Sequence, residues 1–131
     1  MNLDALKKAN ILVLGDIILD KYLEGSVSRV SPEAPVPVLR PESEEIRLGG
    51  AANVANNIKS IGGSAFLISK SANDRTSEII KKLLISNKIN FKIVTNKEYS
   101  SPIKKRIVQN DHQFCRLDDE SFSKLKKKMK P

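Results

Sequence analysis

Several residue types are scarce in this chain of 131 residues, and each scarcity excludes a kind of site. Cys115 is the only cysteine, so neither an internal disulfide nor a multi-cysteine metal site can form. His112 is the only histidine, so a zinc site built from paired imidazoles is excluded. Because residues 114–117 alternate in polarity like a strand, we expect Cys115 to be a small buried side chain.

Long apolar runs and aromatic residues are lacking as well. The apolar stretch that begins at Ile11 is interrupted by Asp16, so we expect no signal peptide, no membrane partner and a cytoplasmic location. The formal charge is +8, but residues 124–130 hold five lysines, which leaves +3 (8 − 5) for the rest. With only six aromatic residues, we expect no nucleic-acid partner, although a salt-dependent contact through the lysine tail is an alternative.

The pattern of apolar residues predicts an α/β domain in which strands and helices alternate. The predicted strands are residues 11–14, 65–68 and 89–94, and the predicted helices are residues 52–61, 76–86 and 121–129. Asn73 or Asp74 would cap the second of these helices. Since buried parallel strands need cover, a sheet of three strands is expected to expose apolar surface and an open edge.

Two segments do not follow this alternation. Residues 22–48 contain four of the six prolines, so they are expected to be extended and edge-like rather than helical. Residues 103–109 and 113–117 predict two further strands, joined by a polar turn at residues 110–112.

Two glycines stand directly before the first predicted helix. Gly49 and Gly50 permit a tight turn and a close approach to a ligand, and Asn53 follows in the first helical turn. The free N–H groups of the helix N-terminus would face this turn, where they could bind a polar ligand. A glycine turn that only begins a packing helix is the alternative.

Three segments together resemble the ribokinase-like (PfkB) sugar kinases in order and spacing. Residues 49–55 (GGAANVA), followed by Gly62, are similar to the N-terminal signature of this family, and residues 13–22 (VLGDIILDKY) to its first strand and substrate loop. Residues 28–38 (SRVSPEAPVPV) resemble the branch that phosphorylates D-glycero-D-manno-heptose 7-phosphate at carbon 1. One departure is Ala72, where the family has a glycine, which implies altered loop geometry.

The resemblance implies an α/β, ribokinase-like fold. The chain would be the N-terminal part of a doubly wound, mostly parallel sheet, as one domain over residues 1–131 with a small β-sheet lid. The lid would comprise about residues 22–48 and 103–117. Such lids cover the sugar and are often shared by two subunits, so a homodimer through the lid is implied. Ordinary surface hairpins are the alternative.

The resemblance also implies a site for a sugar phosphate. The candidate residues are Asp16, Asp20, Gly49, Gly50, Asn53, Lys104 and Arg106. Asp20 would accept hydrogen bonds from sugar hydroxyls, while the glycines and the asparagine would line the opposite wall. Lys104 and Arg106 share one face of a strand and would bind the substrate's phosphate, unless they form only a solvated edge. For Asp16, a role in the turn or in capping is the alternative to substrate binding. Arg29 is a further candidate for binding the substrate's phosphate.

ATP and Mg²⁺ are implied by the family, but their site has no match here. The family's catalytic base is an aspartate in a glycine-rich loop near the C-terminus, whereas no glycine follows Gly63 and no Walker sequence occurs in this chain. We therefore assign no catalytic residue and expect no turnover from this chain alone. A partner that supplies the ATP-binding half, or a remnant without function, are the two alternatives.

Overall fold

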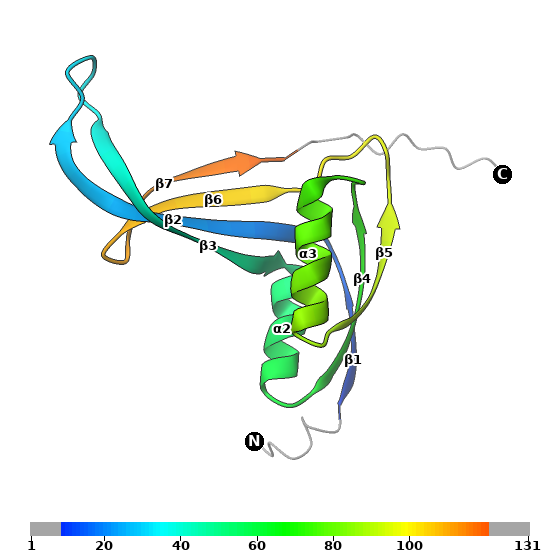
Figure 1. Cartoon of the computed structure of the whole chain (residues 1–131). Helices are drawn as coiled ribbons and strands as arrows, with labels where there is room; N and C mark the ends of the chain where they lie inside the picture. Colours follow the sequence, from blue (N-terminus) through cyan, green and yellow to red (C-terminus); the bar gives the residue numbers. More distant parts are fainter. Residues whose placement is uncertain (1–8, 121–131) are drawn as a thin grey trace.

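A computed structural model describes residues 9–120 as two sheets and two helices (Figure 1). In chain order the elements are β1 (Asn10–Leu14), β2 (Ile17–Val30), β3 (Pro37–Gly50), α2 (Ala51–Ser60), β4 (Ser64–Ser71), α3 (Arg75–Ser86), β5 (Asn90–Thr95), β6 (Ile103–Gln109) and β7 (His112–Asp119). The predicted helix over residues 121–129 lies outside the described residues.

The first sheet, which we call the parallel sheet, has the order β1-β4-β5 with all neighbours parallel. Both helices pack on the same side of it (Figure 1). The core lies between the sheet and the helices, with Leu67, Ile80 and Leu84 fully buried. The three predicted strands and the first two predicted helices are confirmed, with ends that differ by up to three residues.

The ends of the helices follow local sequence signals. The N–H groups of Gly62 and Gly63 bond to the carbonyls of Lys59 and Ile58, and Gly62 has a φ of 87°, which is the Schellman termination expected from two glycines after α2. Asp74 caps α3, since its Oδ1 accepts from the N–H of Ser77 at 2.8 Å. Of the two predicted caps, Asp74 is confirmed.

The second sheet, which we call the outer sheet, has the order β3-β2-β6-β7. It extends away from the helices and the parallel sheet (Figure 1). The proline-rich segment is extended, as predicted, within the long β2–β3 hairpin. Asn110 and Asp111 form the turn between β6 and β7 with φ values of 48° and 63°, and His112 is the first residue of β7.

One face of the outer sheet is apolar. Ile17, Leu19 and Leu48 are buried where this face meets the helices, whereas Leu117, further out, is 56% exposed. The expectation that Cys115 is buried is wrong, because every residue of β7 is exposed. Strand β7 is the edge strand of the outer sheet, and nothing within residues 9–120 covers its apolar side. The alternation at residues 114–117 therefore predicted a strand correctly but not its burial.

Candidate functional site

The candidate site lies on the other face of the outer sheet, which we call the polar face. Strand pairing aligns Asp20 with Lys104 and Tyr22 with Arg106 across β2 and β6, so all four side chains share this face. Arg106 Nη1 donates to Asp20 Oδ1 at 2.7 Å, and both side chains are about four-fifths buried. The hydrogen bond with Asp20 raises the pKa of Arg106 above its ordinary value. The predicted carboxylate and one predicted cation therefore form a single ion pair.

Gly49 lies against this carboxylate. A Cβ at this position would come within 2.6 Å of Asp20 Oδ2 and 2.8 Å of its Cγ, so Asp20 could not keep its place beside a larger residue. Gly50 has a φ of 56°, a conformation that L side chains rarely adopt. The two glycines thus have separate roles. Gly49 leaves room for the Asp20 carboxylate, and Gly50 adopts the backbone conformation of the turn into α2.

An aromatic ring lies between two guanidinium groups on the polar face. The carbon of the Arg106 guanidinium lies 5.1 Å from the ring centre of Tyr22, and that of Arg47 lies 4.5 Å from it. Arg47 is also paired with Glu45 through two hydrogen bonds of 2.6 and 2.7 Å. Tyr22 therefore supports Arg106 from the side while Asp20 fixes its end.

Lys104 is held by carboxylates from the end of β7. Its Nζ lies 3.1 Å from Glu120 and 3.8 Å from Asp118, and Asp118 also accepts from Arg116 at 2.8 and 3.0 Å. The polar face thus carries alternating charges across three strands. An anionic ligand here would have to exchange with these internal carboxylates.

Asp16 and Asn53 lie at the root of the outer sheet. The carbonyl of Asp16 accepts from the N–H of Ala51, the first residue of α2, at 3.0 Å. The Asp16 side chain is exposed, 3.8 Å from Lys70 Nζ, which in turn lies 5.0 Å from the ring centre of Tyr99. Asn53 is exposed at the third position of α2, and the helix has no side-chain cap. These residues border the polar face but make no direct bond with the Asp20–Arg106 pair.

A buried hydrogen-bond cluster fixes the start of β6, the strand that carries Lys104 and Arg106. The hydroxyl of Ser101 lies 2.8 Å from that of Ser71 and accepts from the N–H of Ala72 at 3.2 Å. The N–H of Ser101 donates to Asp74 Oδ2 at 2.9 Å. Burial raises the pKa of the Asp74 carboxyl, but the hydrogen bonds from Ser101 and Ser77 outweigh it and hold that pKa below its ordinary value.

The sequence-based predictions therefore describe the site in part. Asp20, Gly49, Lys104 and Arg106 come together, whereas Asp16, Gly50 and Asn53 lie beside them at the turn into α2. Arg29 lies on the distal part of the hairpin, beside Arg40 in a shallow hollow. Sequence reasoning missed Tyr22, Arg47 and Glu120. Tyr22 follows Asp20 at strand spacing, but only the pairing of β2 with β3 shows that Arg47 lies across from Asp20, with its guanidinium against the Tyr22 ring.

The described residues do not fit an ATP–Mg²⁺ site. No group of three or more His, Cys, Asp or Glu side chains within residues 9–120 is arranged to hold a metal ion. No glycine follows Gly63, so the second half of the chain offers no glycine-rich phosphate loop. Across the same described residues, none of the helices has the length and hydropathy needed to span a bilayer.

Comparisons with known proteins agree with this fold. Residues 8–130 match the profile of the pfkB family carbohydrate kinases. The chain is 42% identical over 113 residues to the "Bifunctional protein HldE" of Vibrio cholerae serotype O1. The matched stretch covers 86% of this chain and 24% of that protein. The chain is also 42% identical over 120 residues to the protein of the same name from Haemophilus influenzae, covering 91% and 25%. The chain thus spans about a quarter of the length of these curated relatives.

Solved structures share the fold at lower sequence identity. A carbohydrate kinase from Agrobacterium tumefaciens superposes with a TM-score of 0.66 at 22% identity, covering 84% of this chain and 35% of that one. Phosphofructokinase-2 from Escherichia coli, solved with fructose-6-phosphate, gives a TM-score of 0.64 at 24% identity, covering 84% and 34%. The expected α/β, ribokinase-like architecture is confirmed.

Proposed function

Because this chain belongs to the pfkB family of carbohydrate kinases, we propose that it forms the sugar-binding part of a sugar-phosphate kinase. The reaction would transfer a phosphoryl group from ATP to carbon 1 of D-glycero-D-manno-heptose 7-phosphate, as in the synthesis of ADP-heptose for the lipopolysaccharide core. The observation that carries the proposal is the Asp20–Arg106 pair, a partly buried carboxylate and guanidinium side by side on one sheet face. This pair offers both kinds of group that a phosphorylated sugar requires.

The chemistry of these side chains suits such a substrate. Asp20 can accept hydrogen bonds from sugar hydroxyls. Because Gly49 has no side chain, the Asp20 carboxylate has room to lie against the backbone of β3. Arg106 donates to Asp20 through Nη1, and no other hydrogen bond from its guanidinium occurs within residues 9–120, so its remaining N–H groups would be the donors for a phosphate. Lys104 adds a second cation once the substrate's phosphate competes with Glu120 and Asp118.

The choice of a heptose phosphate rests on residues 28–38, whose sequence resembles the heptose-kinase branch. The relatives named "Bifunctional protein HldE" support the same choice, because their identity of 42% is well above that of the solved sugar kinases. ATP and Mg²⁺ would be bound by parts of the enzyme outside the described residues. We therefore expect no ADP release by this chain alone when it is mixed with ATP and heptose phosphate.

Calorimetric titration tests the proposal. D-glycero-D-manno-heptose 7-phosphate is added to the purified chain, to Asp20→Asn and to Glu44→Gln. Glu44 pairs with Lys21 on the opposite face of the outer sheet, so its variant removes a carboxylate without touching the site. We expect saturable binding by the parent and by Glu44→Gln, and at least about tenfold weaker binding by Asp20→Asn. Equal binding by all three, or none by a folded parent, would overturn the proposal.

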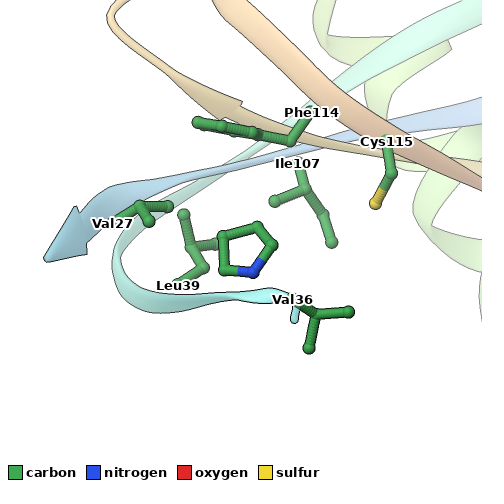
Figure 2. Close-up of a pocket in the computed structure, with 7 residues that line it drawn as sticks. Val27, Val36, Leu39, Ile107, Phe114 and Cys115 are labelled. Atoms are coloured by element: carbon green, nitrogen blue, oxygen red, sulfur yellow. The ribbon is translucent and has the colours of Figure 1, made fainter. Parts of the chain in front are cut away.

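The outer sheet would act as the lid over this sugar, and its apolar face would join two copies of the chain. A groove of about 330 Å³ lies on this face near the hairpin ends. Figure 2 shows Val27, Leu39, Ile107 and Phe114 converging on it, one from each of β2, β3, β6 and β7, with Cys115 alongside. The resemblance to kinases with shared lids supports a second copy as the occupant. Sedimentation velocity should then show a dimer that Phe114→Asp dissociates, and a monomeric parent would contradict this.

A further inference from the structure

Arg47 lies beside Asp20 on the polar face, although no sequence pattern predicted it. Antiparallel pairing places Arg47 directly across from Asp20 on β3, just as parallel pairing places Lys104 directly across from it on β6. The Asp20 carboxylate itself accepts from Arg106, one position further along β6 on the same face, at 2.7 Å. Asp20 is therefore surrounded by three cationic side chains, and Arg47 is the one that has no role so far.

The guanidinium of Arg47 is directed toward Glu45, two residues earlier on its own strand. Its Nε and Nη2 donate to the two oxygens of Glu45 at 2.7 and 2.6 Å, the forked geometry that guanidinium groups also form with phosphates. Its carbon lies 4.5 Å from the ring centre of Tyr22, and that of Arg106 lies 5.1 Å from the same centre. Glu45 therefore occupies donors that an anionic ligand could use, close to the guanidinium already proposed for the phosphate.

The Arg47–Glu45 pair is more exposed than the other ion pairs around Asp20. Its two side chains are 54% and 59% exposed, against 20% and 17% for Arg106 and Asp20. Lys104 is 23% exposed. An exposed ion pair contributes little to stability, because water solvates the separated charges well. Arg47 can therefore exchange its partner at a lower cost than Arg106 or Lys104.

The balance of charge around Asp20 also favours such an exchange. A phosphate brings about two negative charges at pH 7. Each of the three cations around Asp20 already has a carboxylate partner, so this anion must displace at least one carboxylate. Displacing Asp20 would remove the group proposed for the sugar hydroxyls. Displacing Glu45 frees a complete guanidinium fork and leaves the Asp20–Arg106 pair intact.

We propose that Arg47 is a further phosphate-binding residue of this site, which Glu45 occupies until the substrate binds. The substrate's phosphate replaces Glu45 on the fork of Arg47, while Arg106 donates to the same phosphate. The proposal rests on the proposed function, because it adds a residue to the same site. It predicts that removing the negative charge of Glu45 strengthens the binding of the phosphorylated sugar, since Arg47 is then free.

Calorimetry with the full chain tests this exchange. D-glycero-D-manno-heptose 7-phosphate and the same heptose without phosphate are titrated into the parent, Arg47→Gln, Glu45→Gln and Glu44→Gln. Glu44 is the matched control, because it precedes Glu45 on the same strand and is paired with Lys21 on the opposite face. Its variant removes one negative charge at nearly the same place and so measures the effect of net charge alone. Far-UV circular dichroism checks that every variant is folded.

We expect Glu45→Gln to bind the phosphorylated sugar at least about threefold more tightly than the parent, and Arg47→Gln at least about fivefold more weakly. Glu44→Gln should bind it as the parent does, and the heptose without phosphate should bind all four proteins equally. Unchanged affinity in Arg47→Gln, or a gain in Glu45→Gln no larger than in Glu44→Gln, would overturn the proposal. An equal loss for both sugars in Arg47→Gln would also overturn it, because Arg47 would then act on the sugar or on the fold.

A second measurement separates this proposal from the proposed function. Inorganic phosphate is added to the chain with isotopically labelled arginine, and NMR follows the Nε–H signal of Arg47, which is assigned by its loss in Arg47→Gln. We expect this signal to move saturably in the parent, and at lower phosphate concentrations in Glu45→Gln. If it does so while heptose 7-phosphate does not bind, the proposed function is contradicted but the anion site stands. If the sugar binds and the signal does not move, the proposed function stands and the role of Arg47 is overturned.

Discussion

Asp74 provides a sharp test of how the fold positions the site. Its two carboxylate oxygens accept from two different segments, Oδ1 from the N–H of Ser77 in α3 and Oδ2 from the N–H of Ser101 just before β6. Ser101 is 4% exposed, so water cannot readily replace a lost acceptor there. We predict that Asp74→Ala loosens both connections, whereas Asp74→Asn keeps one of them, because an amide has one oxygen.

The magnitude follows from the two bonds. Losing an N-cap costs about 1 kcal/mol. Losing a hydrogen bond to a charged group costs about 1.5–3 kcal/mol, and we take the lower half because Asp74 is only partly buried. The free energy of unfolding should therefore fall by about 2–3 kcal/mol in Asp74→Ala and by about 1–2 kcal/mol in Asp74→Asn.

The same residue predicts a pH dependence. The pKa of Asp74 is lower in the folded chain than its ordinary value near 4, so the ionised carboxylate stabilises the folded state above about pH 4. This contribution is lost as the pH falls through the lowered pKa of the folded state. The difference in stability between the parent and Asp74→Asn should therefore shrink below about pH 4.

Urea denaturation followed by circular dichroism at pH 7 and at pH 3 measures both effects. Glu78→Gln is the control, because Glu78 is an exposed carboxylate in the first turn of the same helix. Its free energy of unfolding should change by no more than about 0.5 kcal/mol. The reasoning is refuted if Asp74→Asn is as stable as the parent at pH 7, or if its deficit is the same at both pH values.

Further predictions concern packing and the site, each checked by urea denaturation or calorimetry. Gly25→Ala should lower the free energy of unfolding by about 1–3 kcal/mol, because the new Cβ would lie 2.9 Å from the Arg40 carbonyl carbon. The control Ser26→Ala, at the next residue, should not lower it. Leu67→Ala should lower the free energy of unfolding by about 2–5 kcal/mol, since this side chain is fully buried. Leu117→Ala should lower it by only about 0.5 kcal/mol, since Leu117 is exposed. Gly49→Ala should weaken heptose 7-phosphate binding about tenfold by displacing Asp20, so unchanged affinity would contradict the role of Gly49.

Local signals in the sequence predicted most of the elements. The glycine pair after α2, the aspartate cap of α3 and the polar turn before β7 each act over a few residues, and all three are observed. Apolar runs likewise predicted the three parallel strands. These features are predictable because they depend on neighbouring residues and on burial that the local pattern records.

The parts that failed depend on contacts distant in the sequence. Cys115 was predicted to be buried, but alternation marks a strand without saying whether anything covers it. The pairing of Arg106 with Asp20 joins residues 86 positions apart and follows from the parallel alignment of β2 with β6. No local pattern contains that register, so neither the ion pair nor the place of Arg47 beside Tyr22 could be inferred.

The central claim is that the polar face binds a sugar that already carries a phosphate, through Arg106. The most direct measurement compares the dissociation constants of D-glycero-D-manno-heptose 7-phosphate and the same heptose without phosphate, for the parent, Arg106→Gln and Arg75→Gln. Arg75 lies exposed at the start of α3 and controls for the loss of one positive charge. We predict that the parent and Arg75→Gln prefer the phosphorylated sugar by at least about tenfold and that Arg106→Gln loses this preference. Equal affinity of the parent for both sugars, or a preference that survives in Arg106→Gln, would contradict the account.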